Sequence, residues 1–364
     1  MSGSVQVIKG RGALSNPANR FHQHIIVRDS DEYSMPHSDF VSCGKIQPKT
    51  EVHEVEAKTI ISRNKSPDLP FEQSVNPYAG CEHGCVYCYA RPTHAYHDLS
   101  PGLDFETQLL CKVNAVSLLE KEFSKSGYVC KPIVLGANTD PYQPIEKQYK
   151  ITRNILKLCL RVKHPVTIIT KGNLIERDLD LLADMAKLGL CSVNVSLTTL
   201  DNELKRTLEP RAASVQSRLR VIKELTKRGV PTGVLVAPLI PAINDSELEA
   251  ILTESAKAGA HSARYILLRL PHEVKELFSE WLHSYFPKRA RHVLSLIEQS
   301  RGGKLYNASF DQRMTGSGIF SDILAKRFTL ACKKSHLNTE DKERLNCLDF
   351  SIDGLSSSGQ ISLF

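Results

Sequence analysis

The sequence predicts an α/β fold, in which a helix-covered parallel sheet closes part-way into a (β/α)6 barrel. Between residues 71 and 270, apolar runs rich in Val, Ile and Leu alternate with amphipathic helical runs. This alternation is typical of a parallel sheet that is buried on both faces. It gives six strand–helix units over about 200 residues, whereas a closed eight-fold barrel needs about 250. We therefore expect an open, partial barrel.

The barrel is expected to begin near Phe71 and to contain no internal repeat. Its strands are chosen for continuous apolar, β-branched runs and its helices for apolar residues at helical spacing. The expected strands are Ser74–Ala79, Pro132–Gly136, Val166–Thr170, Ser192–Thr198, Thr232–Ala237 and Ala263–Leu268. The expected helices are Phe105–Ser124, Lys150–Arg161, Ile175–Leu188, Val215–Arg228 and Asp245–Ala258.

Three further segments flank the predicted barrel. Residues 1–70 carry scattered Pro, Gly and His and are expected to form an irregular N-terminal extension, with a strand around Val52–Ile61. Residues 271–334 are expected to form a helical C-terminal extension around a Gly-rich segment. Residues 335–364 are polar and rich in Ser and Gly, which predicts a flexible tail. The expected helices of the extension are Glu273–Phe286, Arg289–Gln299 and Ile319–Lys333.

Composition excludes several classes of protein. The 364 residues are 41% apolar and 24% charged, which argues against a disordered or fibrous chain. The net charge of +7 is compatible with a polyanionic partner but does not establish one. No apolar run approaches the roughly 20 residues of a membrane helix, and the first residues lack the apolar core of a secretory signal. We expect a cytoplasmic protein whose ten cysteines are mostly reduced thiols.

A cluster of three cysteines carries the most chemical information. Cys81, Cys85 and Cys88 form a C-x3-C-x2-C motif, which is too dense for a disulfide framework and indicates a metal centre. Zinc is one alternative, with His83 or His94 as the fourth ligand, although structural zinc sites usually use two separated pairs. An iron–sulfur cluster is the other, and the missing fourth cysteine would leave one iron open for a ligand that is not protein.

The motif, with Tyr87 before its last cysteine and placed after the first strand of an α/β chain, resembles that of the radical S-adenosylmethionine (radical SAM) superfamily. Other segments resemble a poorly characterised bacterial branch related to spore photoproduct lyase. These segments are GRGALSNPANRF, GCEHGCVYCYARPTHAY, GANTDPYQPIE, TKGN, TTLD, EPRAAS, VAPLIPAIND and RGGKLYNASF. The resemblance implies a radical SAM partial barrel over about residues 71–270.

The resemblance also implies the cofactors and the chemistry. A [4Fe–4S] cluster would bind to Cys81, Cys85 and Cys88, and S-adenosylmethionine would chelate the open iron through its amino and carboxylate groups. One electron, from a reductant such as flavodoxin or ferredoxin, would then release methionine and a 5′-deoxyadenosyl radical that takes hydrogen from a substrate. The protein would place the reactants and exclude water and oxygen.

Candidate cofactor ligands follow the strands, because ligands of open α/β sheets bind at the carboxyl ends of strands. Asn138, Thr139 and Asp140 offer acceptors for the ammonium group, where the superfamily commonly has a GGE-like segment; the alternative is a simple turn that ends the strand. Lys171 follows the next strand and offers a cation for the carboxylate, or is a solvated surface charge.

Later strands and loops supply further candidates. The hydroxyls of Ser196 and Thr198 could bind a ribose or be structural. Glu209 and Arg211 could bind cofactor or substrate, or pair with each other. Tyr87 could contact the adenine or shield the cluster.

A third set of residues is expected to line the substrate space. Arg91, His94 and Tyr142 are the candidates for catalytic roles there. Three other cysteines lie among apolar residues and are expected to pack in the core. They are Cys111, Cys159 and Cys191.

Two features suggest partners. Gln360, Leu363 and Phe364 resemble the Gln-x-x-Leu-Phe peptide that docks bacterial repair factors on the replication sliding clamp; the alternative is that they fold back onto the domain. A set of basic residues could bind nucleic-acid phosphates or form a solvated face. The set is Lys288, Arg289, Arg291, Arg313, Lys326 and Arg327.

The leading functional hypothesis is radical repair or modification of DNA, such as a pyrimidine lesion. Radical modification of RNA, a peptide or a metabolite is the second enzyme hypothesis. A zinc-stabilised, non-enzymatic nucleic-acid-binding module is the alternative of another class.

Overall fold

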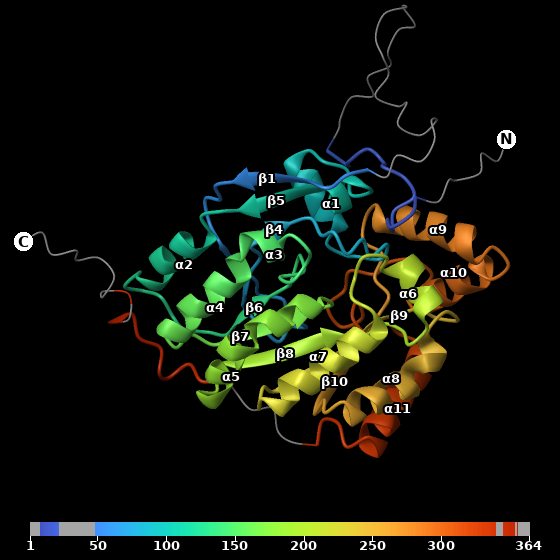
Figure 1. Ribbon diagram of the computed structural model, residues 1–364. Helices are drawn as coiled ribbons and strands as arrows, with labels where there is room; N and C mark the ends of the chain where they lie inside the picture. Colours follow the sequence, from blue (N-terminus) through green and yellow to red (C-terminus); the bar gives the residue numbers. More distant parts are fainter. Residues whose placement is uncertain (1–7, 22–47, 340–344, 354, 356–364) are drawn as a thin grey trace, which may run out of the picture.

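The structure of the protein is a computed structural model that describes residues 8–21, 48–339, 345–353 and 355 (Figure 1). Its main sheet has seven strands in the order β10-β9-β8-β7-β6-β3-β2. The strands of the sheet are β2 (Ile61–Arg63), β3 (Gln73–Val75), β6 (Ile133–Leu135), β7 (Val166–Thr170), β8 (Cys191–Ser196), β9 (Thr232–Leu239) and β10 (Ser262–Leu267). The neighbouring strands from β10 through β9, β8, β7 and β6 to β3 pair in parallel, and β2 is antiparallel to β3.

The order of the strands confirms the predicted fold class. Each parallel strand lies beside the previous one of the barrel, and the edge strands β10 and β2 are not paired with each other among the described residues. The result is an open, partial (β/α)6 barrel. One face of the sheet is fully buried, as Val193, Val195, Val234 and Val236 show, whereas residues of the other face such as Asn194 are half-buried.

Helices cover the outside of this sheet (Figure 1). Each turns an apolar stripe inward, as α7 does with Val221, Ile222 and Leu225. The last helix packs against α8 and so joins this layer. The outer helices are α2 (Ala115–Phe123), α4 (Ile151–Arg161), α5 (Leu179–Lys187), α7 (Val215–Lys227), α8 (Leu248–Lys257) and α11 (Ile319–Lys334).

Shorter and C-terminal helices complete the described fold. Helices α9 (Val274–Tyr285) and α10 (Ala290–Gln299) form a second apolar cluster around Trp281, which also includes Val86 and Tyr87 of the cysteine loop. The remaining helices are α1 (Asp104–Thr107), α3 (Glu146–Tyr149) and α6 (Asn202–Leu208). No helix in the described ranges is both long and apolar enough to cross a membrane.

The predicted helix over Phe105–Ser124 is confirmed only in its second half, by α2. A strand, β5 (Gln108–Lys112), separates α1 from α2 and pairs with β1 (Glu51–Val55) and β4 (Tyr78–Ala79) in a second, three-stranded sheet. Leucine favours helices, but here Leu109 and Cys111 alternate with half-buried neighbours, and a distant strand supplies the hydrogen bonds. Tertiary pairing therefore overrides the local preference.

Part of the predicted tail is bonded to the barrel. In residues 345–353, the Asn346 amide donates to the Gly189 carbonyl at 2.9 Å, and the Ser351 amide donates to the Val162 carbonyl at 3.1 Å. These carbonyls precede β7 and β8, so the segment is fixed at the amino ends of the strands. The expectation of a flexible tail is therefore wrong for this segment, whereas Gln360–Phe364 lie outside the described residues.

Phe350 anchors that segment in an aromatic group with Phe123, Tyr128 and His164. We expect Phe350→Ala to lower the free energy of unfolding by about 2 kcal/mol, less than the 3–5 typical of a fully buried Phe, because the ring is half-buried. Urea unfolding followed by circular dichroism measures it. Leu348→Ala is the control, since Leu348 is 96% exposed. Equal urea midpoints for the two variants would contradict this packing.

Candidate active site

The three cysteines lie together in a loop after β4. Cys81 and Cys85 are buried and Cys88 is half-buried, and all three are free thiols. Gly80 and Gly84 of this loop have φ of +81° and +67°, and a Cβ on Gly84 would meet Glu106 Oε2 at 2.7 Å. The backbone turn that gathers the thiols therefore requires glycine.

The thiols suit a metal cluster. Burial raises the pKa of Cys85 to about 12, and burial together with the charges of Asp140, Cys85 and Cys88 raises the pKa of Cys81. Thiolates at these positions therefore need a neutralising metal. Within the described residues, no three His, Cys, Asp or Glu side chains converge on a single ion. A [4Fe–4S] cluster does not require that, because each thiolate binds a different iron.

The histidines considered as zinc ligands have other partners. His83 Nδ1 lies 3.2 Å from Asp140 Oδ2. His94 Nε2 lies 2.8 Å from the Gln108 carbonyl, and burial lowers its pKa to about 4. These contacts engage one ring nitrogen of each histidine, an arrangement that is also usual for zinc ligands, so the metal analysis described below decides between zinc and an iron–sulfur cluster.

A buried ion pair between Arg91 and Glu106 stabilises the cysteine loop. Arg91 Nη2 lies 2.5 Å from Glu106 Oε1, and both side chains are fully buried. Arg91 also donates through Nε to the Cys85 carbonyl at 2.8 Å. Glu106 accepts from the amides of Gly12 and Ala13 at 3.1 and 2.8 Å. The N-terminal segment 8–21 is thereby pinned against the loop.

Asp140 connects the loop to the ends of β6 and β7. Its carboxylate accepts from Thr170 Oγ1 at 2.6 Å and from the Lys171 amide at 2.7 Å. Burial alone would raise its pKa, but the charge and hydrogen bond of His83, with these two donors, lower it to about 2. Next to it, Thr139 Oγ1 donates to the Gly80 carbonyl at 2.7 Å.

Glu209 forms a second buried centre beside Cys85. It pairs with Arg218 and accepts from the Tyr87 hydroxyl, and Thr198 Oγ1 donates to it at 2.7 Å. Burial would raise its pKa, but the charges of Arg218 and Lys171 and the two hydroxyl donors lower it to about 2.

The ends of β7 and β8 complete this centre. Lys171 Nζ lies 5.8 Å from the centroid of the Tyr87 ring. The Ser196 carbonyl accepts from Arg218 Nη1 at 3.1 Å. Tyr87, Lys171, Ser196, Thr198 and Glu209 are therefore gathered at one edge of the sheet, next to a thiol.

Comparison with known proteins identifies the family. Residues 75–254 match the model of the radical SAM superfamily. An uncharacterized protein of Mycobacterium tuberculosis is 39% identical over 241 residues, which are 65% of this chain and 70% of that protein. The chain belongs to the radical SAM superfamily. It is therefore an enzyme of a family that uses a [4Fe–4S] cluster and S-adenosylmethionine.

Other radical SAM proteins are similar to this chain at lower identity. A solved structure of spore photoproduct lyase matches with a TM-score of 0.56 at 16% identity, over 78% of this chain and 79% of that chain. This likeness shows a shared fold. A protein of Pseudomonas phage M6, named radical SAM Nα-GlyT isomerase, is 24% identical over 234 residues, which are 62% of this chain and 46% of that protein.

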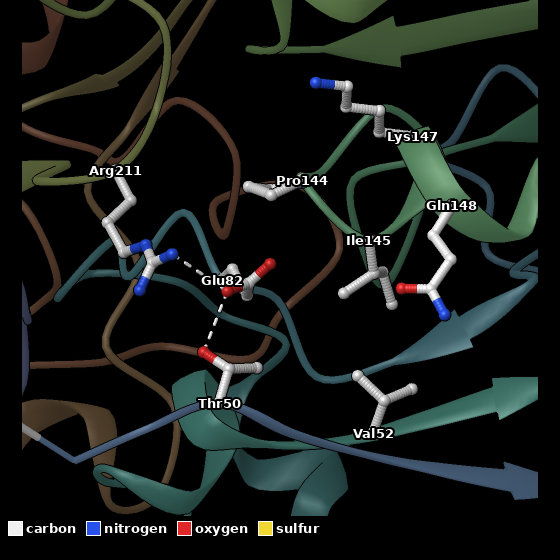
Figure 2. Close-up of a pocket in the computed structure, with 8 residues that line it drawn as sticks. All are labelled: Thr50, Val52, Glu82, Pro144, Ile145, Lys147, Gln148 and Arg211. Carbon is white, nitrogen blue, oxygen red and sulfur yellow. Dashed lines mark hydrogen bonds and ion pairs between the residues drawn. The ribbon is translucent and has the colours of Figure 1, made fainter.

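Arg211 lies apart from the other candidate ligands of this radical SAM enzyme. It does not pair with Glu209; its Nη2 lies 3.0 Å from Glu82 Oε1, which also accepts from Thr50 Oγ1 at 2.8 Å (Figure 2). The three line a pocket of about 560 Å³ whose other lining residues are Val52, Pro144, Ile145, Lys147 and Gln148.

The three predicted catalytic residues lie in the protein interior. Arg91, His94 and Tyr142 are at most 1% exposed and do not line an open space. Arg91 donates to the loop backbone. His94 packs edge-on against Phe105, with the two ring centroids 5.3 Å apart. Arg91 therefore has a positioning role in the radical SAM loop.

Several residues of this centre escaped the sequence analysis. Arg218 lies within α7 and Glu106 within α1, where a charged residue on the buried side of a helix is the signal that could have drawn attention. His83 was considered only as a metal ligand. Gly12 and Ala13 lie in a segment expected to be irregular, and nothing in its pattern indicates a contact with Glu106.

We expect the low pKa of Glu209 to make the fold sensitive to acid. The unfolded carboxyl titrates near 4.5 and the folded one near 2, so its contribution to stability is complete above pH 4.5 and is lost as pH falls towards 2. Glu209→Gln should unfold more easily at pH 7 and show a smaller further loss between pH 4.5 and 2. Urea unfolding across this range measures it.

The matched control for this test is Glu203→Gln, an exposed residue of α6 whose side chain is 76% exposed. It should keep the wild-type pH profile. A Glu209→Gln profile parallel to the wild type would contradict the assigned pKa.

Proposed function

We propose that this protein is a radical SAM enzyme that repairs or modifies a nucleic acid. Cys81, Cys85 and Cys88 hold the [4Fe–4S] cluster, and S-adenosylmethionine binds at the adjoining carboxyl ends of the strands. The observation that carries the proposal is the gathering of three free thiols beside Lys171 and Glu209 at that edge. Three protein ligands leave one iron for the amino and carboxylate groups of S-adenosylmethionine.

When bound, the two groups supply one-electron cleavage of a carbon–sulfur bond, which yields a carbon radical that takes hydrogen from a substrate. The chain's own residues bind and orient. Asn138 is exposed at the end of β6, and its amide oxygen can accept from an ammonium group. Lys171, which has no ion pair among the described residues, offers a cation for a carboxylate.

The other candidates divide by how fully they are already bonded. The Ser196 hydroxyl at the end of β8 is the ribose ligand, and Tyr87 covers the cluster side of that space. Thr198 is a positioning residue, because its Oγ1 already contacts Glu209 and the Ala237 carbonyl. Thr139, Asp140 and Glu209 are positioning residues, because their oxygens already accept or donate to neighbours. Arg211 is outside the proposed cofactor site.

Several observations support a nucleic-acid substrate. The chain shares its fold with a spore photoproduct lyase that was solved with a dinucleoside spore photoproduct. Lys288, Arg289 and Arg291 are exposed and carry no ion pair within the described ranges. Arg313 and Arg327 do not contribute in the way expected, because they pair with carboxylates. RNA, peptide and metabolite substrates are the alternatives that the experiments below separate.

Two partners belong to the proposal. Gln360, Leu363 and Phe364 dock on the replication sliding clamp, and a small redox protein such as flavodoxin or ferredoxin supplies the electron. The nine described cysteines are all free thiols, in keeping with work in a reducing, cytoplasmic compartment.

We expect Cys81→Ser, Cys85→Ser and Cys88→Ser each to lose the cluster, because each removes the thiolate of one iron. Iron and sulfide are measured after anaerobic reconstitution, and the wild type should hold about four of each. Cys130→Ser, a half-buried cysteine outside the loop, is the control and should keep them. Zinc without sulfide in the wild type would contradict the proposed cofactor.

We expect damaged DNA to raise the rate of 5′-deoxyadenosine formation above the rate with intact DNA. The reason is that a substrate that donates hydrogen converts the 5′-deoxyadenosyl radical into 5′-deoxyadenosine. Chromatography of anaerobic reactions with ultraviolet-irradiated and unirradiated DNA of one sequence measures the rate. Equal rates with both would contradict lesion repair. Stimulation by RNA alone would instead support the RNA alternative.

A further inference from the structure

We propose that a basic pocket beside the end of β10 binds backbone phosphates of the nucleic acid. The inference rests on the proposed function and names where the substrate's backbone lies. The pocket has a volume of about 410 Å³ and no carboxylate among its lining residues, which are Leu270, His272, Lys275, Lys304, Leu305 and Tyr306.

The charge of the pocket is largely uncompensated. Lys304 is exposed and has no ion pair in the described part of the chain, and Lys275 has only Glu276 at 3.4 Å, with both side chains about half exposed. Such a pair contributes little and leaves the ammonium free to bind an anion. Tyr306 adds an aromatic side chain beside these cations. Proteins that bind single-stranded nucleic acids use this combination, in which cations contact the phosphate backbone and bases stack on the aromatic ring.

Arg269 connects the pocket to the cysteine loop. It directly precedes Leu270 of the pocket, and its guanidinium lies 5.2 Å from the centroid of the Tyr89 ring, next to Cys88. Its buried Nε has no hydrogen-bond partner, and its Nη1 contacts only Met314 Sδ, at 3.7 Å. A guanidinium with no oxygen acceptor is a ready donor for a phosphate.

A second guanidinium strengthens the local positive field. Arg301 is 1% exposed and donates to the carbonyls of Leu267 and Leu268 at 3.0 and 2.7 Å, which fixes it to the end of β10. Burial, and then the charge of Arg269, lower its pKa to about 10. The nearby carboxylate of Asp68 already pairs with Arg313. Two close cations without a carboxylate of their own favour an incoming anion.

The geometry therefore points to a path for a nucleic acid between the cluster and the pocket. Tyr89 marks the end at the cluster, Arg269 lies between, and Lys304 and Tyr306 form the outer end, while the buried Arg301 adds positive charge without contacting the ligand. A nucleotide positioned at the cluster would have neighbouring phosphates within this stretch of cations.

The test is binding of fluorescein-labelled 12-nucleotide DNA and RNA of one sequence, followed by fluorescence anisotropy over a series of KCl concentrations. We expect Lys304→Ala and Arg269→Gln each to weaken binding about 5-fold. Each should also reduce the slope of log K against log [KCl] by about 0.7, the value for one phosphate contact on a single strand. Lys223→Ala is the control and should bind like the wild type, because Lys223 of α7 is exposed and forms no ion pair with the described residues.

The outcomes separate the pocket from the proposed function. If the wild type binds and the Lys304→Ala and Arg269→Gln variants bind with the same affinity and salt slope, the pocket is not the binding site. The proposal of a nucleic-acid substrate is not affected by that result. No binding of either oligonucleotide by the wild type overturns both. Binding of RNA alone, with the same losses in the variants, supports the pocket and overturns the DNA substrate. Because Lys304 is exposed, we expect Lys304→Ala to fold normally, and it therefore tests the pocket even if Arg269→Gln fails to fold.

Discussion

The ion pair between Arg91 and Glu106 is the interaction on which the site depends. Burying two charges is costly, and it is tolerated only when every donor and acceptor is used. Arg91 meets that condition by bonding the loop carbonyls of Cys85, Pro101 and Gly102, and Glu106 by accepting from the N-terminal segment. One pair therefore fixes the cysteine loop, the second sheet and the chain start against one another, and removing one partner would cost about 3–5 kcal/mol.

The same principle recurs at the strand ends and separates two kinds of residue. Asp140 and Glu209 are ionised and buried, and each accepts from several donors, so they hold the loop to β6, β7 and β8. The groups that remain for ligands include the three thiols, the Asn138 side-chain amide and the Lys171 ammonium, which forms no ion pair in the described part of the chain. Rigid carboxylates thus surround a small set of free groups, which is the arrangement that catalysis by a bound cofactor requires.

The sequence could predict what depends on local pattern. Val166–Thr170 is the strand expected, because apolar periodicity reflects burial within the segment itself. The same pattern could not reveal β5, whose strand character comes from pairing with β1, nor the role of Phe350, which depends on a distant aromatic group. The cysteine spacing indicated the cluster, but Arg211 and Arg91 were misplaced because spacing cannot say which carboxylate an arginine meets in space.

Electron paramagnetic resonance of the anaerobically reconstituted, dithionite-reduced protein tests the central claim most directly. The account predicts a [4Fe–4S]⁺ signal whose shape changes when S-adenosylmethionine is added, because the cofactor binds the iron that the three cysteines leave open. A cluster signal that S-adenosylmethionine does not alter, or no cluster signal at all with zinc bound instead, would contradict it.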